Sequence, residues 1–489
     1  MRQLHTLYSS FHRTSISPSI QCQHYITTFP RSNTLQRYAI AASQPFQQNL
    51  STHVLHQKIS GARMFILNRP EKLNALNLGM IRNIEPQLKA WEVSKLAKVI
   101  LMKGTGSGKF CVGDDISAEV LLKVKSKDPD ALYFFQEKFG LVQTIATLNT
   151  PYVAILDGYA LGGATGLFVH CPFRIATEKT IFSLPEASIG AFLSSGSSFF
   201  LPKLDGETGT YLALTGDRLQ GIDTFFAGIA THYVPSSRLS ALEDRLIDLE
   251  TSEHEIIQRV LEEFVDPVAT DKIGFTPVVR ETIDRCFKYD SVDEIIGALE
   301  NEKSTTWIRE TKKKIMSMSP TSLCVTLKTL RKAQFMSFNA CLKLEFDLIQ
   351  KYLVTKDFHE GVIAAFLSRP RRKPQWQPSS LEEITDDDID QLYFNEPSPN
   401  ALTLPSRLDI IDQYPYSRFA LPTEDEVRRA VTGEGAEFGF EGRLKEENDV
   451  IEWFEKGHKR KWGVKEKVLD ILRRKTVSTE DGLAWKRTL

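Results

Sequence analysis

Residues 152–166 have the sequence YVAILDGYALGGATG, and this segment is the most informative about the architecture of the chain. Its first half is a short, nearly continuous apolar run, which is typical of a strand buried on both faces of a sheet. Its second half ends a strand at Gly162 and Gly163 and then begins a helix. Two similar apolar runs precede it, MFILN at 64–68 and KVILMKG at 98–104. These runs predict an α/β region with a parallel layer of strands.

The segment between the first two apolar runs is predicted to be an amphipathic helix. Its large apolar side chains recur at helical spacing, at Ile81, Ile84, Leu88 and Trp91. Pro86 lies within this pattern, and we expect it to kink the helix or to shift its start. A strand, a helix and a further strand in this order make a βαβ unit, whose strands run parallel.

The composition is typical of a large globular protein. Of 489 residues, 42% are hydrophobic and 25% are charged, which excludes a disordered, collagenous or coiled-coil chain. The 61 Lys and Arg residues balance the 62 Asp and Glu residues, which argues against a globally basic nucleic-acid binder but does not detect local clusters. No run of about 18 apolar residues is free of charge, so we expect no membrane span. The six cysteines include no Cys-x-x-Cys pair, and they predict neither a disulfide framework nor a zinc site.

The amino-terminal segment has a composition of its own. No acidic residue occurs before Glu71, and the first part of the chain contains several Arg residues among many Ser and Thr residues. This composition is typical of a mitochondrial transit peptide. We therefore predict that residues 1–45 are a targeting segment and that the mature protein lies in the mitochondrial matrix. The alternative is a disordered tail without a targeting role.

Three further stretches combine glycine with polar side chains. They are FCVGDDI at 110–116, GYALGGATG at 158–166 and SLPEASIG at 183–190. Two backbone N–H groups that point at one atom, one of them at a helix start, form a site for a negatively charged oxygen. Glu186 follows an apolar run and is expected on a turn. The glycine-rich stretch at 103–110 lacks the spacing of a phosphate-binding loop, so we do not expect nucleotide hydrolysis.

In their order along the chain, these motifs resemble the crotonase (enoyl-CoA hydratase/isomerase) superfamily. The segment ILNRPEKLNAL at 66–76 belongs to the same pattern. Longer matches resemble the 3-hydroxyisobutyryl-CoA hydrolase family, which acts in mitochondrial valine breakdown; these are FRIATEKTIF, LALTGDRLQG, AGIATHYV, MSPTSL and DFHEGV. The resemblance extends from about residue 50 to residue 393. It implies a crotonase ββα spiral at 50–250, a helical region at 251–393, and a C-terminal extension at 394–489.

The resemblance also implies the chemistry of a site that binds an acyl-CoA thioester. The thioester oxygen would lie between the N–H groups of Val112 and Gly163, and one such donor is worth about 3 kcal/mol of barrier. Glu186 would be the catalytic carboxylate, which either activates water or forms an anhydride with the acyl group. The implied substrate-binding residues are Asn74, Ala75, Leu76, Gly162, Glu137 and Ser194. No metal is implied, and no cofactor beyond the coenzyme A of the substrate.

The sequence departs from the hydrolase pattern within this site. The family has an acidic residue eight positions after the glutamate, where this chain has Ser194. Ala164 replaces the third glycine of a triplet, and Asp114 replaces a small residue beside the expected oxyanion donor. A substrate-binding glutamate of the family aligns with Lys138, although Glu137 is adjacent. Two hypotheses follow: Glu186 still hydrolyses a thioester, or the fold now serves as a scaffold without catalysis.

The C-terminal extension contains a cationic cluster. Between 456 and 475 there are nine Lys or Arg residues against Glu466 and Asp470. Apolar residues recur at helical spacing at Val464, Val468, Ile471 and Leu472, so one helix face is apolar and the rest is basic. Such a helix could dock on protein while its cations face phosphates. The alternative is a basic helix that packs on its own domain.

Two short motifs of the extension resemble a fungal branch of the hydrolase family. They are QYPYSRFALPTEDEV at 413–427 and DGLAWK at 481–486. The resemblance implies a partner, because members of that branch are found in the mitochondrial small ribosomal subunit. The sequence therefore supports two functions, a mitochondrial 3-hydroxyisobutyryl-CoA hydrolase and a component of that ribosomal subunit.

Overall fold

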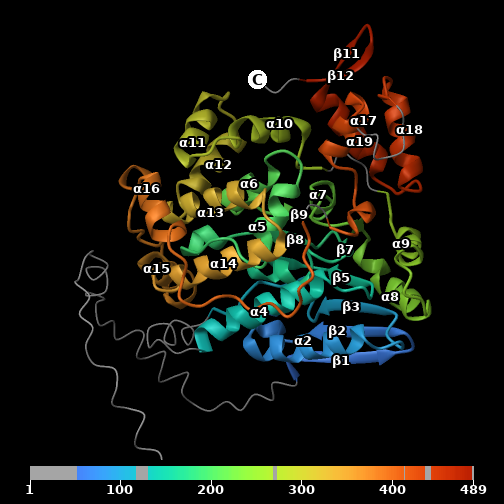
Figure 1. The fold of residues 1–489 in the computed structure, drawn as a ribbon, viewed down its shortest axis with the longest axis horizontal. Helices are drawn as coiled ribbons and strands as arrows, with labels where there is room; N and C mark the ends of the chain where they lie inside the picture. The colour runs from blue at the N-terminus through green and yellow to red at the C-terminus, as the bar shows by residue number, and fades with distance from the viewer. Residues whose placement is uncertain (1–51, 117–129, 268–272, 412–413, 435–441, 487–489) are drawn as a thin grey trace, which may run out of the picture. The chain divides into compact units, whose positions relative to one another are not determined.

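Two sheets form the first half of the fold (Figure 1). The larger sheet has six strands in the order β1-β2-β3-β5-β7-β10: Val54–Ile59, Ala62–Leu67, Val99–Gly104, Tyr152–Leu156, Phe173–Ala176 and His232–Tyr233. The smaller sheet has four strands in the order β4-β6-β8-β9: Lys109–Cys111, Tyr159–Leu161, Ile181–Ser183 and Leu219–Gln220. All neighbouring strands are parallel except for the antiparallel pairs β1–β2 and β8–β9. The predicted α/β fold with a parallel layer is confirmed.

This computed structural model describes residues 52–116, 130–267, 273–411, 414–434 and 442–486. The predicted transit peptide lies outside the described residues. Residues 47–489 form one compact unit, so the predicted boundaries at 250 and 393 stay predictions. Within the described ranges, no helix is both long and apolar enough to cross a bilayer.

Helix α2 (Leu78–Glu92) follows the sequence pattern closely. Its predicted apolar face is fully buried. The Asn77 side chain caps the helix by accepting a hydrogen bond from the Met80 N–H, which fixes the start. The helix continues through Pro86, so the expected shift of its start does not occur.

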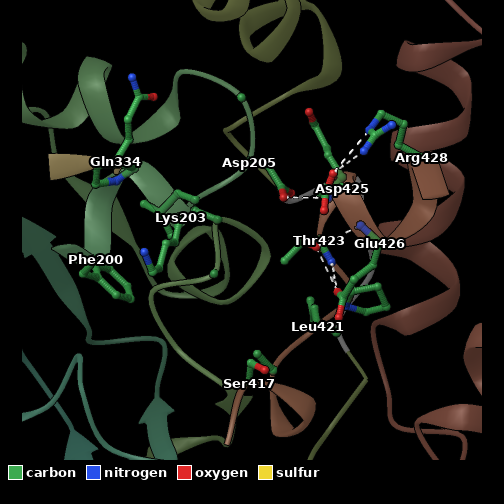
Figure 2. Close-up of a pocket in the computed structure, with 18 of the residues that line it drawn as sticks. Phe200, Lys203, Asp205, Gln334, Ser417, Leu421, Thr423, Asp425, Glu426 and Arg428 are labelled. Carbon is green, nitrogen blue, oxygen red and sulfur yellow. Dashed lines mark hydrogen bonds and ion pairs between the residues drawn. The ribbon is translucent and has the colours of Figure 1, made fainter. Parts of the chain in front are cut away.

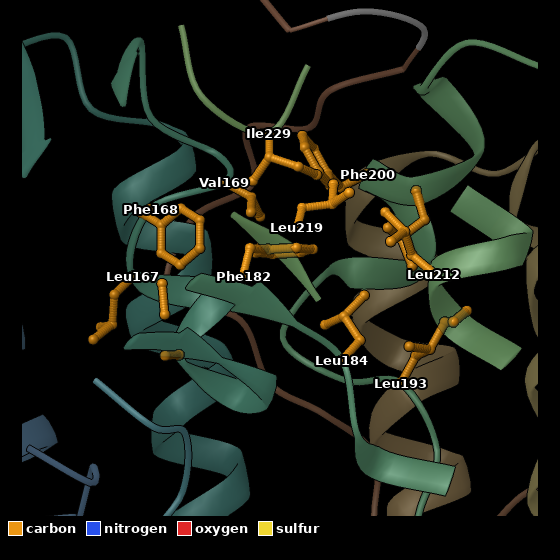
Figure 3. Packing of buried hydrophobic residues seen from close by; sticks show 14 of the residues in the cluster. Leu167, Phe168, Val169, Phe182, Leu184, Leu193, Phe200, Leu212, Leu219 and Ile229 are labelled. Atoms are coloured by element: carbon orange, nitrogen blue, oxygen red, sulfur yellow. The ribbon is translucent and has the colours of Figure 1, made fainter. Parts of the chain in front are cut away.

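Helical segments connect successive strands of the two sheets. The helices of this part are α4 (Asp130–Ala146), α5 (Ser197–Phe200), α6 (Thr208–Thr215), α7 (Ile222–Phe226) and α8 (Leu239–Ile247). Apolar side chains from the smaller sheet and from these helices pack together (Figure 3), and among them Phe168 meets Phe110 edge to face at 5.7 Å. This core supports the strand ends at which the predicted site residues lie.

A helical region follows, as predicted (Figure 1). Its helices are α9 (His254–Glu263), α10 (Pro277–Cys286), α11 (Val292–Asn301), α12 (Thr306–Ile315), α13 (Pro320–Ala333), α14 (Phe338–Tyr352), α15 (Lys356–Val362) and α16 (Asp386–Ile389). Most begin at a Ser or Thr whose side chain accepts a hydrogen bond from the first turn, as Ser337 does for α14. Helices α13 and α14 bury apolar faces against the spiral.

The extension is an ordered layer on the body of the protein. It contains α17 (Glu424–Thr432), α18 (Glu447–Gly457), α19 (Val464–Lys475) and the hairpin β11 (Thr476–Thr479) and β12 (Gly482–Trp485). The predicted apolar face of α19 is buried, and it packs in one cluster with Phe225 and Phe226 of α7. A groove of about 1250 Å³ lies between extension and body (Figure 2), and at its wall Thr423 and Glu426 form the capping box of α17.

Several cations of the predicted basic cluster face carboxylates of the protein itself. Lys461, Lys467 and Arg474 are almost fully buried. They form ion pairs with residues of the body, namely Lys461–Glu262, Lys467–Asp205 and Arg474–Asp284. For these three residues the second alternative holds, a basic helix that packs on its own domain. Five other cations of this stretch are exposed and form no ion pair with another described residue: Lys456, Lys459, Arg460, Lys465 and Arg473.

Candidate acyl-CoA site

The two predicted glycine turns lie next to each other. Strands β4 and β6 pair in parallel, so their carboxyl ends meet at one edge of the smaller sheet. Gly113 follows β4 with φ of +97°, and a Cβ at this residue would lie 3.2 Å from the Gly163 nitrogen. A side chain would therefore separate the two turns, which explains why glycine is needed. Gly162 and Gly163 begin a 3-10 helix after β6 rather than an α-helix.

The structure contradicts one of the two predicted oxyanion donors. The N–H of Val112 donates to the Leu73 carbonyl at 3.2 Å and so already has an acceptor. The N–H groups of Asp114 and Gly163 have no backbone acceptor in the described part of the chain. The Asp114 carboxylate lies against Gly163, since a Cβ on that glycine would be 2.6 Å from both carboxylate oxygens. The available pair of donors is thus Asp114 and Gly163.

Glu186 lies on a short 3-10 helix directly after β8, on the turn where the sequence predicts it. A Cβ on Gly162 would be 3.2 Å from the Glu186 Oε1, so the carboxyl group faces the glycine turn. Both of its oxygens are buried and have no hydrogen-bond partner among the described residues. Burial raises the pKa of Glu186 to about 8, and the nearby Lys138 ammonium opposes that rise only in part. The group is therefore largely protonated at neutral pH.

The three main departures from the hydrolase pattern are neighbours in space. Lys138, on α4, is 1% exposed, and its ammonium lies 2.6 Å from the Asp114 Oδ2. The same ammonium lies 3.5 Å from the Ser194 hydroxyl. The cation offsets a carboxylate that would otherwise oppose negative charge on a thioester oxygen. The pair therefore explains how Asp114 is tolerated beside Gly163.

Glu137 does not take part in the site, contrary to the prediction. It lies on the outer side of α4 and forms a bidentate ion pair with Arg82 of α2. One residue along a helix turns the side chain by about 100°. Lys138 rather than Glu137 therefore faces the glycine turns, and the direct alignment of the family's glutamate with Lys138 agrees with this geometry.

Hydrogen bonds hold the loop that contains the implied substrate-binding residues Asn74, Ala75 and Leu76 against the site. Asn74 is fully buried, and its side chain accepts from the Arg69 N–H and donates to the Thr105 and Lys109 carbonyls. Arg69 also donates to the Ala75 carbonyl at 2.7 Å. The Leu76 N–H donates to the Gly113 carbonyl at 2.8 Å. Asn74 therefore orders the loop, and its predicted contact with substrate stays a prediction.

Two buried side chains that the sequence analysis missed hold the loop after Glu186. Glu345 of α14 accepts hydrogen bonds from the N–H groups of Gly196 and Ser198, at 2.8 and 2.9 Å. His170 lies 2.8 Å from the Ser195 carbonyl. Glu345 lies on the buried face of α14, and an acidic residue among apolar residues at helical spacing is a usable signal, because a buried carboxylate needs donors. His170 gave no such signal.

The described residues include no group of three His, Cys, Asp or Glu side chains that could hold a metal ion. The features of the site are instead two unpaired backbone donors, one protonated carboxyl group and one buried ion pair. Such an arrangement can polarise a carbonyl group and exchange a proton with it.

Comparison with known proteins places this site in a family. A family model described as enoyl-CoA hydratase/isomerase matches residues 62–393. The mitochondrial 3-hydroxyisobutyryl-CoA hydrolases of Xenopus laevis and Homo sapiens are 41% and 38% identical. Their matches cover 69% and 75% of this chain, and 87% and 94% of the relatives. The small ribosomal subunit protein mS47 of Neurospora crassa is 37% identical, and the match covers 96% of each chain.

Solved structures agree with this family. A carnitinyl-CoA dehydratase from Mycobacterium thermoresistibile superposes with a TM-score of 0.66 at 28% identity, over 73% of this chain and 99% of that one. An enoyl-CoA hydratase from Rhodobacter sphaeroides gives 0.64 at 28% identity, over 72% and 100%. The chain therefore belongs to the enoyl-CoA hydratase/isomerase family, has the crotonase fold, and lies in the branch that includes the 3-hydroxyisobutyryl-CoA hydrolases and mS47.

Proposed function

We propose that this chain is a component of the mitochondrial small ribosomal subunit, built on a crotonase domain and located in the mitochondrial matrix. The proposal rests on the extension. It packs on the body through a shared apolar cluster and through buried ion pairs. The match to mS47 covers 96% of the chain, whereas the hydrolase matches cover about three quarters or less. The altered acyl-CoA site agrees with a fold that is retained as a scaffold.

The exposed cations of the extension are the proposed contact with ribosomal RNA. Lys459 and Arg460 are consecutive, have φ of +54° and +58°, and lie between α18 and α19. Left-handed backbone at such side chains is costly and persists only where neighbours fix it. Here Trp462 stacks on Phe225 at 5.4 Å, and the buried Lys461 pairs with Glu262. The turn thus presents two cations in a fixed position, as a phosphate contact requires.

Sedimentation of tagged variants in mitochondrial extracts tests this proposal. Wild-type chain should co-sediment with small subunits at low salt. The charge reversal Lys459→Glu with Arg460→Glu should release the chain at lower salt, because two phosphate contacts are lost. The matched control is Lys58→Glu with Lys95→Glu, two exposed cations of the body. Sedimentation of the wild type only with free matrix proteins would refute the proposal.

A second function, hydrolysis of an acyl-CoA thioester such as 3-hydroxyisobutyryl-CoA, is supported by Glu186. Its two buried oxygens have no hydrogen-bond partner in the described part of the chain, and Oε1 faces the turn where the N–H groups of Asp114 and Gly163 have no backbone acceptor. The thioester oxygen would accept from those two donors. The ionised Glu186 would take a proton from water as the water oxygen bonds to the carbonyl carbon, and the thiol of coenzyme A would leave with a proton.

Release of free thiol from 3-hydroxyisobutyryl-CoA tests this second function. The chain should be assayed without its first 45 residues beside Glu186→Gln, which keeps the volume and removes the base. Wild-type turnover should rise as the pH passes through about 8, the pKa of Glu186. Equal rates for the two proteins at pH 9 would exclude catalysis by Glu186.

A further inference from the structure

The segment that connects the body to α17 contacts the body at several of its described residues. We call residues 405–411 and 414–423 the strap. Ser406 donates to the Gln143 side chain of α4, and the Ile410 carbonyl accepts from the Phe338 N–H at the start of α14. Tyr416 stacks on His254 at 4.3 Å. Part of the strap is the QYPYSRFALPTEDEV motif, so this motif has a structural role at the body surface.

Tyr414 of the strap reaches a buried histidine beside the acyl-CoA site. Its hydroxyl lies 2.7 Å from the Nδ1 of His170, and the Nε2 of the same ring lies 2.8 Å from the Ser195 carbonyl. A carbonyl oxygen only accepts, so Nε2 must hold the proton and Nδ1 must accept from Tyr414. Burial lowers the pKa of His170 to about 4, so the ring is neutral and has one tautomer at pH 7.

The peptide unit between Ser195 and Gly196 is held at both of its polar ends. The Ser195 carbonyl accepts from His170, and the Gly196 N–H donates to Glu345 at 2.8 Å. Ser195 has φ of +67° and Gly196 has φ of +77°, so the loop needs such restraints to keep its shape. A Cβ on Gly196 would be 2.5 Å from the His170 ring, which requires glycine at this contact.

The same loop contacts the residues on which thioester chemistry would depend. The Ser195 hydroxyl donates to the Gly163 carbonyl at 3.2 Å. The Ser194 hydroxyl lies 3.5 Å from the Lys138 ammonium. A rotation of the Ser195–Gly196 peptide would therefore disturb the glycine turn and the buried ion pair together.

We infer that Tyr414 is a positioning residue, which couples docking of the strap to the conformation of the Ser194–Ser198 loop through His170. The inference rests on the proposed acyl-CoA function for its catalytic consequence, but the coupling itself does not need turnover. A partner that displaced the strap would free His170 Nδ1 and loosen the loop. The extension and the acyl-CoA site are thus connected through one hydrogen-bonded chain from Tyr414 to Gly163.

Hydrogen exchange of the full chain tests the coupling without substrate. Tyr414→Phe keeps the ring that packs against Phe199 and Phe200 and removes only the donor. Exchange at Gly196 and Ser198 should rise by about five- to tenfold, as expected for one lost hydrogen bond. The matched control Tyr416→Phe keeps its stack on His254 and should leave exchange in this loop unchanged.

A double-mutant cycle with His170→Gln identifies the route. The glutamine amide can still donate to the Ser195 carbonyl, but the ring that connects Ser195 to Tyr414 is gone. Tyr414→Phe should therefore have no further effect on exchange in that background. If wild type hydrolyses thioesters, Tyr414→Phe should lower kcat with little change in KM. Failure of the hydrolase proposal would appear as absent wild-type turnover with the exchange result intact. Equal exchange in wild type and Tyr414→Phe would overturn the inference.

Discussion

At the scale of single residues, the three positions that differ from the hydrolase pattern act as one unit. Lys138 is the common neighbour of Asp114 and Ser194, at 2.6 and 3.5 Å. The sequence identified all three positions and predicted that Glu186 lies on a turn. It did not predict that they meet, because Asp114 and Ser194 reach Lys138 from separate turns of the spiral. The prediction of Val112 as a donor was wrong, because the Val112 N–H already donates to the Leu73 carbonyl. Leu73 lies 39 residues away in a loop of irregular backbone, so this hydrogen bond could not be predicted from the sequence.

Restoring only the missing acidic residue should not restore an active site. A carboxylate introduced by Ser194→Asp would lie beside the Lys138 ammonium and pair with it, so turnover of 3-hydroxyisobutyryl-CoA should stay at the wild-type level. The triple variant Asp114→Gly, Lys138→Glu and Ser194→Asp removes the cation and should raise turnover by about a hundredfold. The release of free thiol measures the turnover of the single variant and of the triple variant. A gain from the single variant as large as that from the triple would contradict the account.

The raised pKa of Glu186 should also affect stability. Below its ordinary pKa of 4.5 the carboxyl is protonated in both the folded and the unfolded state. Between 4.5 and about 8 only the folded state holds the proton, so the free energy of unfolding should fall as the pH rises through this window. Glu186→Gln removes the contribution of this group to the pH dependence. Urea unfolding at pH 5 and pH 8 should therefore show a larger loss for wild type than for the variant, and equal losses would argue against a buried, protonated Glu186.

At the scale of elements, helices and strands were largely predictable and the orientation of charged side chains was not. The apolar spacing of α2 and α19 identified their buried faces correctly. The exposure of the α19 cations could not be predicted, because it depends on carboxylates far away in the sequence, such as Asp205. The same limit explains why Glu137 rather than Lys138 was predicted in the site. The two residues are adjacent on α4, but one side chain faces the surface and the other faces the site.

Two lysines of α19 provide a matched pair. Lys467 is 4% exposed, pairs with Asp205 and donates to the Phe226 carbonyl at 2.9 Å, whereas Lys465 is exposed. Lys467→Met should lower the free energy of unfolding by about 3 kcal/mol, because Asp205 loses one of its buried partners. Lys465→Met should leave the melting temperature unchanged. Thermal unfolding measures the stability of both variants. A similarly small effect of the two substitutions would mean that the Lys467–Asp205 pair contributes little to stability.

At the scale of the whole molecule, the extension and the crotonase body form one structure. The extension shares a hydrophobic cluster with α7, and the strap crosses α4 and the start of α14 before it reaches α17. The sequence predicted a C-terminal extension at 394–489, but it contained no signal for the contacts by which the strap lies against the body. Those contacts involve single side chains such as Tyr414, which are visible only once the chain is folded.

The ribosomal proposal is tested most directly by the stoichiometry of the chain in purified mitochondrial small subunits. Subunits would be isolated through a high-salt cushion, and the chain would be quantified by mass spectrometry against other proteins of the subunit. The account predicts one copy per subunit, with the extension protected from protease. The result that would contradict the ribosomal proposal is a chain that is absent from washed subunits, or present far below one copy. Such a chain would be recovered instead in the free matrix fraction.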